Sequence, residues 1–127
     1  MRNECRVETR KRQVVVRHLA AKLMGCPPTL LNDPVAVSSV LDRVTEVVQM
    51  TFLQGVNHRF SPQGVSVVYL LAESHIAVHT WPECGMVDIE IVTCNPESDV
   101  MAGLQEAIRL FGATECDHRV WVFTHNY

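Results

Sequence analysis

Two helical patterns separated by a long run of strand-like segments constrain the fold of this chain more than any other feature. In the first pattern, Asp33 suits a helix N-cap and Pro34 suits the first helical position. Apolar residues then recur at helical spacing and form one stripe, made of Val37, Val40, Leu41, Val44 and Val48. We therefore predict a helix that begins at Pro34 and ends near Gln49 or Met50.

The second helical pattern lies toward the end of the chain. Asn95 is a candidate N-cap, Pro96 would occupy the first helical position, and Gly112 would end the helix. The apolar face of this helix would consist of Val100, Leu104, Ala107, Ile108 and Phe111. We predict a second helix between Asn95 and Gly112.

Short runs rich in Val, Ile and Thr fill residues 51–94 between the two helices. They are interrupted at Ser61-Pro62-Gln63-Gly64 and at Trp81-Pro82-Glu83-Cys84-Gly85, which predicts about four strands. Further strands are expected over 14–23 and roughly 118–124. Strands grouped between two helices, without strict alternation, predict an α+β two-layer sandwich with both helices on one face of a largely antiparallel sheet.

The size of the chain favours one domain. With 127 residues, 47% of them hydrophobic, a single core over residues 13–127 is expected, preceded by a polar tail at 1–12 to which we assign no function. Such a core leaves little room for an enclosed substrate cavity, so a site shared with a second copy is expected. We predict a homodimer, which would have four layers.

Charge and cysteine content exclude several classes of function. The net charge of −3 lacks the positive footprint that nucleic-acid binding requires. No apolar run approaches the roughly 18 residues of a membrane span. Five cysteines without CxxC spacing argue against a disulfide framework or a zinc ribbon, and reduced thiols fit a cytoplasmic protein.

Polar and titratable residues gather unexpectedly over 71–83, between two segments that otherwise look buried. If Ser74 attacks the carbonyl of Glu73, an acyl shift and β-elimination would cut the chain and leave a pyruvoyl group at residue 74. In a strand, His75 and His79 share one face, where they could move the protons that these steps require. From spacing alone, the alternative stays open that Ser74 sits in a tight turn and that hydrogen bonds satisfy both histidines.

The next strand carries a thiol and two carboxylates on one face. Asp88, Glu90 and Cys94 alternate there, while the opposite face is apolar and would point into the core. This pattern suggests a proton donor beside a cation-binding pocket, although Cys94 alone would more often be a small buried residue. We predict no metal site, because His75 and His79 would lie about 13 Å apart in a strand.

The segment from Glu73 to Glu83 resembles the self-processing segment of the prokaryotic S-adenosylmethionine decarboxylase family. The resemblance covers most of the chain, from Val15-Val16-Arg17-His18-Leu19 through Asn57-His58-Arg59-Phe60, Gly64-Val65-Ser66 and Thr93-Cys94 to the second helix. It implies an α+β sandwich that works as a homodimer with sites at the interface.

The resemblance also implies residue roles. Cleavage between Glu73 and Ser74 would give fragments 1–73 and 74–127 and convert Ser74 into the pyruvoyl group. His79 would transfer protons during cleavage with help from Ser66. The pyruvoyl ketone would form a Schiff base with the substrate and act as electron sink, without metal or pyridoxal phosphate, and Cys94 would protonate the product carbanion.

The expected substrate is S-adenosylmethionine, on the route to spermidine. Phe60 would stack on its adenine, and Glu83 would contribute to the pocket. The chain departs from the family at Cys84-Gly85-Met86-Val87-Asp88, where relatives commonly carry aromatic and small residues, and at Asn95, where Gly is usual. The acid at Asp88, with Glu90 on the same face, keeps an arginine or ornithine decarboxylase open as an alternative.

A third interpretation is an unprocessed binding or regulatory partner of an active relative. The residues tied to processing are all present, so only the altered segment after Glu83 supports it. Activation by an amine such as putrescine stays open.

Overall fold

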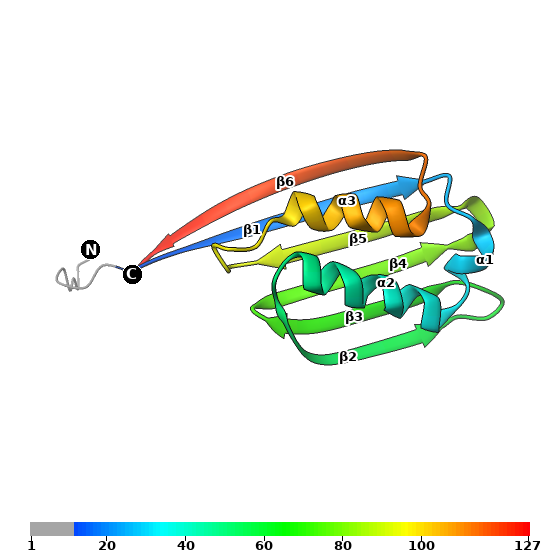
Figure 1. The fold of residues 1–127 in the computed structure, drawn as a ribbon, viewed down its shortest axis with the longest axis horizontal. Coiled ribbons are helices and arrows are strands. Elements are labelled where there is room, and N and C mark those ends of the chain that lie inside the picture. Colours follow the sequence, from blue (N-terminus) through cyan, green and yellow to red (C-terminus); the bar gives the residue numbers. More distant parts are fainter. Residues whose placement is uncertain (1–11) are drawn as a thin grey trace, which may run out of the picture.

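The computed structural model describes residues 12–127, so the predicted tail, except for its last residue, lies outside the described residues. These residues form a sheet of six antiparallel strands in the order β2-β3-β4-β5-β1-β6 (Figure 1). The strands are β1 (Gln13–Met24), β2 (Thr51–Arg59), β3 (Val65–Ala72), β4 (Ser74–Trp81), β5 (Met86–Thr93) and β6 (Glu115–Asn126). The helices are α1 (Pro28–Leu31), α2 (Pro34–Val47) and α3 (Val100–Phe111), with a 3-10 turn η1 (Pro82–Cys84) between β4 and β5.

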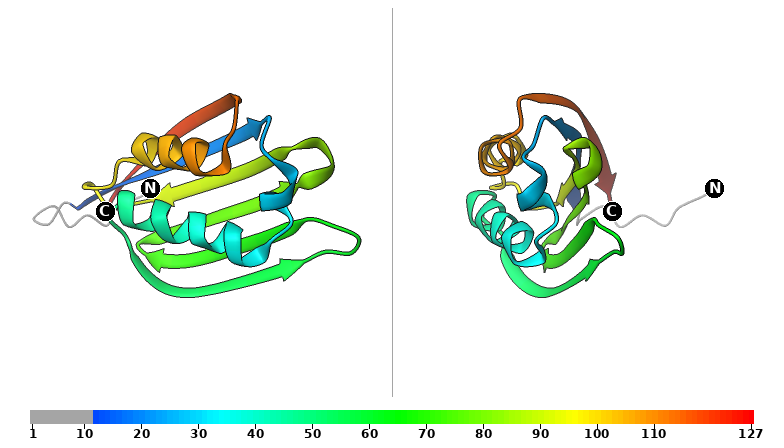
Figure 2. Two further views of the ribbon diagram at one scale, coloured as in Figure 1. Left: turned by 45° about the vertical axis from the view of Figure 1, so that its right-hand side comes forward. Right: turned by 90° about the vertical axis from the view of Figure 1, so that its right-hand side faces the viewer.

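Two layers make up the molecule. Helices α2 and α3 lie side by side on one face of the sheet, and within residues 12–127 no helix covers the other face (Figure 2). The core between the layers contains Leu19, Leu41, Val44, Ile76, Ile89, Ile91, Leu104 and Phe111. The predicted α+β two-layer sandwich is confirmed. None of the helices in this part of the chain is both long and apolar enough to cross a membrane.

Local sequence signals explain where helix α2 begins. The Asp33 carboxylate accepts hydrogen bonds from the backbone N–H groups of Val35 and Ala36, at 3.0 and 3.3 Å, and so satisfies two donors that the first turn leaves unpaired. The helix ends at Val47, slightly earlier than predicted. On its sheet side, the Tyr69 hydroxyl donates to the Asp42 carboxylate at 2.6 Å and ties β3 to α2.

The predicted start of the second helix is wrong. Helix α3 begins at Val100, and its N-cap is Asp99, which accepts from the N–H of Ala102 at 3.0 Å. The Asn95 side chain instead accepts from the N–H of Glu97 at 2.9 Å and closes a turn ahead of the helix. The two residues offer the same capping chemistry, and tertiary contacts such as Ser98 Oγ donating to the Val48 carbonyl at 2.7 Å fix the later start.

Alternation along β4 and β5 agrees with the predicted faces. On β4, Ile76, Val78 and Thr80 are buried against the helices, and His79 is exposed on the open face. On β5, residues 87, 89, 91 and 93 are buried. The prediction that the two strands place Asp88, Glu90 and the histidines away from the helices is confirmed.

Candidate active site

The turn between β3 and β4 places the predicted cleavage bond at one end of the sheet. β3 ends at Ala72 and β4 begins at Ser74, so Glu73 is the single residue between them. Ser74 pairs across the sheet with Thr93, the last residue of β5. The Glu73–Ser74 bond therefore lies beside Cys94, the residue that follows β5.

Glu73 and Cys94 make two contacts at this turn. The backbone N–H of Cys94 donates to the Glu73 carbonyl at 3.4 Å, and the Cys94 thiol donates to Glu73 Oε1 at 2.9 Å. The hydrogen bond to Glu73, and to a lesser degree partial burial, raises the pKa of the Cys94 thiol. A thiol with a raised pKa stays protonated at neutral pH, as a proton donor requires.

The contact between Glu73 and Cys94 predicts the pH at which the Cys94 thiol becomes reactive. This can be measured on Ser74→Ala protein, which should not cleave itself. Because the Glu73 carboxylate raises the pKa of Cys94, the Glu73→Gln change should lower that pKa and move the pH midpoint of Cys94 alkylation to lower pH. Mass spectrometry of peptides reads Cys94 separately from the exposed Cys84, whose alkylation profile should be the same in both proteins. An unchanged pH midpoint for Cys94 alkylation would show that Glu73 does not raise the pKa of the Cys94 thiol.

His75 is the histidine nearest to the cleavage bond. Its Nδ1 lies 3.5 Å from Ser74 Oγ, and its Nε2 lies 3.4 Å from Glu90 Oε1. Both contacts are long for hydrogen bonds. The strand pattern predicted that both His75 and His79 could move protons at this bond, and the family resemblance assigned the role to His79. Of the two, the structure places His75 beside Ser74.

Ser66 and His79 form a separate pair. They stand opposite each other on β3 and β4, and Ser66 Oγ lies 2.6 Å from His79 Nδ1. A contact this short orients the imidazole and leaves its Nε2 for another group. The structure therefore brings Ser66 and His79 into contact, and their shared role in cleavage stays a prediction.

Ser74 and His79 lie far apart within one chain. They are five residues apart on β4, which corresponds to about 16 Å at the strand rise. Ser74, Glu73 and Cys94 thus gather at one end of the sheet, and the Ser66–His79 pair lies toward the other end. The structure does not bring all the predicted processing residues together in one protomer.

Two predicted substrate-binding residues lie at the same end as the Ser66–His79 pair. Phe60 is half exposed in the loop between β2 and β3, and its ring packs edge-on against His58 with centroids 4.6 Å apart. Glu83 is exposed in η1, the turn that follows β4. An exposed ring is available for stacking, and neither residue is near Ser74 of its own chain.

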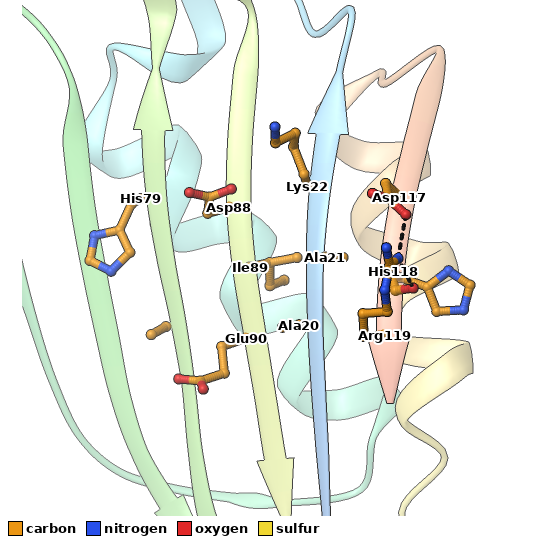
Figure 3. Close-up of a pocket in the computed structure, with 11 residues that line it drawn as sticks. Ala20, Ala21, Lys22, His79, Asp88, Ile89, Glu90, Asp117, His118 and Arg119 are labelled. Carbon is orange, nitrogen blue, oxygen red and sulfur yellow. Dashed lines mark hydrogen bonds and ion pairs between the residues drawn. The ribbon is translucent and has the colours of Figure 1, made fainter. Parts of the chain in front are cut away.

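Asp88 and Glu90 line a shallow hollow on the open face of the sheet (Figure 3). Its volume is about 380 Å³, and it spans β4, β5, β1 and β6. Its walls include Ala20, Lys22, Ala77, His79, Asp117, His118 and Arg119. His79 therefore adjoins both the hollow and Ser66.

Two cations, Lys22 and Arg119, offset part of the acidic charge of this hollow. Asp88 pairs across the sheet with Lys22 on one side and with His79 on the other. Asp117 forms an ion pair with Arg119 at 2.6 Å, drawn as a dashed line in Figure 3. The three acids of the lining, Asp88, Glu90 and Asp117, outnumber the two cations Lys22 and Arg119 by one, so the hollow keeps a small excess of acidic charge. In residues 12–127, no three His, Cys, Asp or Glu side chains are grouped closely enough to hold a metal ion.

Comparison with known proteins gives a consistent result. The family described as S-adenosylmethionine decarboxylase matches residues 17–123. An S-adenosylmethionine decarboxylase proenzyme of Archaeoglobus fulgidus is 37% identical over 98 residues, covering 77% of this chain and 84% of that protein. The proenzyme of Carboxydothermus hydrogenoformans is 38% identical over 102 residues, covering 76% of each chain.

Solved structures agree with the fold. The crystal structure of the adenosylmethionine decarboxylase from Aquifex aeolicus superposes with a TM-score of 0.78 at 26% identity, covering 85% of this chain and 89% of that one. The AdoMetDC of Trypanosoma brucei shares the fold with a TM-score of 0.62 at 15% identity, covering 82% of this chain and 45% of that one. The family match spans most of the described sheet and both long helices, and on these grounds this chain belongs to the S-adenosylmethionine decarboxylase family.

Proposed function

We propose that this protein is a self-processing, pyruvoyl-dependent decarboxylase that acts on S-adenosylmethionine. The observation that carries the proposal is the contact between Glu73 and the protonated Cys94 thiol, directly beside the Glu73–Ser74 bond, in a chain of this family. Relatives that are identical at over a third of the aligned residues are named as proenzymes of this decarboxylase.

Self-cleavage would use groups that the turn already supplies. The Ser74 hydroxyl attacks the Glu73 carbonyl carbon, the peptide C–N bond breaks, and Glu73 becomes an ester on Ser74 Oγ. Loss of the Cα proton of residue 74 then breaks its Cβ–Oγ bond and releases Glu73 as a carboxylate. Water replaces the nitrogen of residue 74, ammonia leaves, and the new fragment 74–127 begins with a pyruvoyl group.

The residues around Ser74 fit such a group. The pyruvoyl ketone would accept the electron pair that remains when the substrate loses its carboxylate. Cys94 holds a proton at neutral pH beside residue 74, so it is suited to return a proton to the substrate carbon. Glu73 keeps the thiol protonated before cleavage through its hydrogen bond.

Separation of the two residue groups supports a homodimer with shared sites. Because His79 lies about 16 Å along β4 from Ser74, the partner's His79 would act at Ser74 if two sheets pack face to face in opposite directions. The uncovered face of the sheet carries exposed apolar side chains from β2, β3 and β6, namely Val56, Val68, Leu70, Trp121 and Phe123. These apolar side chains lie toward the two edges of the face, on either side of the polar hollow, and exposed apolar surface of this kind fits a subunit interface.

The substrate prediction is tested by carbon dioxide release from carboxyl-labelled S-adenosylmethionine, arginine and ornithine, each offered separately to the processed protein. We expect release from S-adenosylmethionine alone, because the matching family and the relatives that resemble most of this chain are named for that substrate. Release from arginine or ornithine alone would assign the scaffold to a cationic amino acid. Boiled protein and Cys94→Ala protein serve as controls for non-enzymatic release.

A further inference from the structure

Arg17 stands out because one nitrogen of its partly exposed guanidinium group is buried without a hydrogen-bond partner. Its Nη1 atom has no solvent-accessible surface and no hydrogen-bond partner among residues 12–127. A buried guanidinium nitrogen without a partner is costly, because its desolvation is not repaid by a hydrogen bond. Such a group could donate a hydrogen bond to an anion that forms only when the chain is cleaved.

The sheet places Arg17 in line with the cleavage bond. Arg17 on β1 pairs with Thr93 on β5, and Thr93 pairs with Ser74 on β4, so the three residues form one row across the sheet. In β1, Arg17 shares its face with the buried Leu19, which points toward the helices. The Arg17 side chain therefore lies on the same side of the sheet as Thr93.

A second cavity connects Arg17 to the processing residues. Its volume is about 360 Å³, and it is lined by Gln13, Val14, Val15, Arg17, Glu73, Cys94 and Pro96. Among the described residues that form this wall, Arg17 is the one cationic side chain. Before cleavage, the one carboxylate in this wall is the Glu73 side chain, and it already accepts a hydrogen bond from the Cys94 thiol.

We infer that Arg17 binds the α-carboxylate that self-cleavage creates on Glu73, an inference that rests on the proposed function. When the Cβ–Oγ bond of residue 74 breaks, the leaving group is this carboxylate, which gains a full negative charge beside Cys94. A guanidinium matches a carboxylate with two parallel N–H···O bonds. Arg17 is thus a positioning residue that stabilises the leaving group of the elimination step.

The substrate carboxylate is the other anion that could reach this cavity. It loses its charge as carbon dioxide departs, so an arginine bound tightly to it would stabilise the bound substrate more than the transition state. The Glu73 carboxylate instead gains charge in the step that releases it, and it stays in the protein. This difference in charge development favours Glu73 as the partner of Arg17.

The test follows self-cleavage of Arg17→Met and Arg17→Lys proteins on denaturing gels. The Arg17→Met protein should cleave itself about 100-fold more slowly, because the leaving carboxylate is no longer stabilised. An effect of this size is seen when one donor to a developing oxyanion is removed. The ester that precedes elimination should then accumulate, and neutral hydroxylamine should cut it at once into fragments 1–73 and 74–127, with serine at the new N-terminus. Arg17→Lys should recover part of the rate.

Stability separates this role from a structural one. In the Ser74→Ala background, Arg17→Met should unfold at the same or a higher temperature, because it removes a buried guanidinium nitrogen that has no hydrogen-bond partner. A lower unfolding temperature together with slow cleavage would make Arg17 a structural residue and overturn the inference. Normal cleavage with a raised KM for S-adenosylmethionine would overturn it in favour of the substrate carboxylate. If the unmutated chain itself never cleaves, the proposed function fails instead.

Discussion

Ser74→Ala protein should remain a single chain of 14.3 kDa, whereas the unmutated protein should separate into fragments 1–73 and 74–127. Without the hydroxyl there is no nucleophile for the Glu73 carbonyl and no oxygen to expel, so neither cleavage nor the electron-accepting group can form. Decarboxylation should fall by at least about 10⁴-fold, as when a nucleophile is removed from other enzymes. Denaturing electrophoresis and carbon dioxide release measure the two effects.

A matched serine provides the control. Ser39 lies on helix α2, where its hydroxyl donates to the Val35 carbonyl at 3.0 Å, far from the turn at Glu73. Ser39→Ala protein should cleave and decarboxylate like the unmutated protein. Cleavage of Ser74→Ala protein at the same bond would show that another group performs the attack.

Co-expression of Ser74→Ala and His79→Ala chains should restore activity that neither chain has alone. If each site combines Ser74 of one chain with the partner's His79, a mixed dimer contains one intact site and one site that lacks both groups. Random pairing makes half of the dimers mixed, so activity should reach about one quarter of the unmutated value. The His79→Ala chain should be cleaved only in the mixture, which differently sized tags make visible.

The control for this mixture is Ser74→Ala co-expressed with the Ser74→Ala, His79→Ala double variant, which offers no intact site in any pairing and should stay inactive. If the two single variants also fail to complement although mixed dimers form, each site would belong to one chain. Such a result would require β4 to bring His79 to Ser74 within a protomer, against the separation seen here.

Local signals were enough to predict most of the fold. Asp33-Pro34 and the apolar stripe identified α2, and alternating residues identified the faces of β4 and β5. The predicted start of α3 was wrong, because Asn95 and Asp99 both carry capping side chains and tertiary contacts, such as those of Asn95 with Gln49 and of Ser98 with Val48, distinguish them. Propensity alone cannot rank two caps four residues apart when tertiary contacts decide.

The residues of the candidate site could be predicted from the sequence, but most of their contacts could not. The contact of Ser66 with His79 depends on the register of β3 and β4, which a single turn residue, Glu73, determines. Pairing of Asp88 with Lys22 joins residues distant in the chain and changes the charge balance that Asp88 suggested by itself. The distance between Ser74 and His79, by contrast, follows from counting residues along a strand.

The most direct test of the account is the mass of the protein after incubation with S-adenosylmethionine and cyanoborohydride. A self-processing S-adenosylmethionine decarboxylase should give two fragments, with residues 74–127 starting in a pyruvoyl group, and a mass increase on that fragment alone from the reductively trapped amine. The increase should be absent when arginine or ornithine replaces S-adenosylmethionine. A single intact chain of 14.3 kDa, or two fragments of which the second starts with serine and traps nothing, would contradict it.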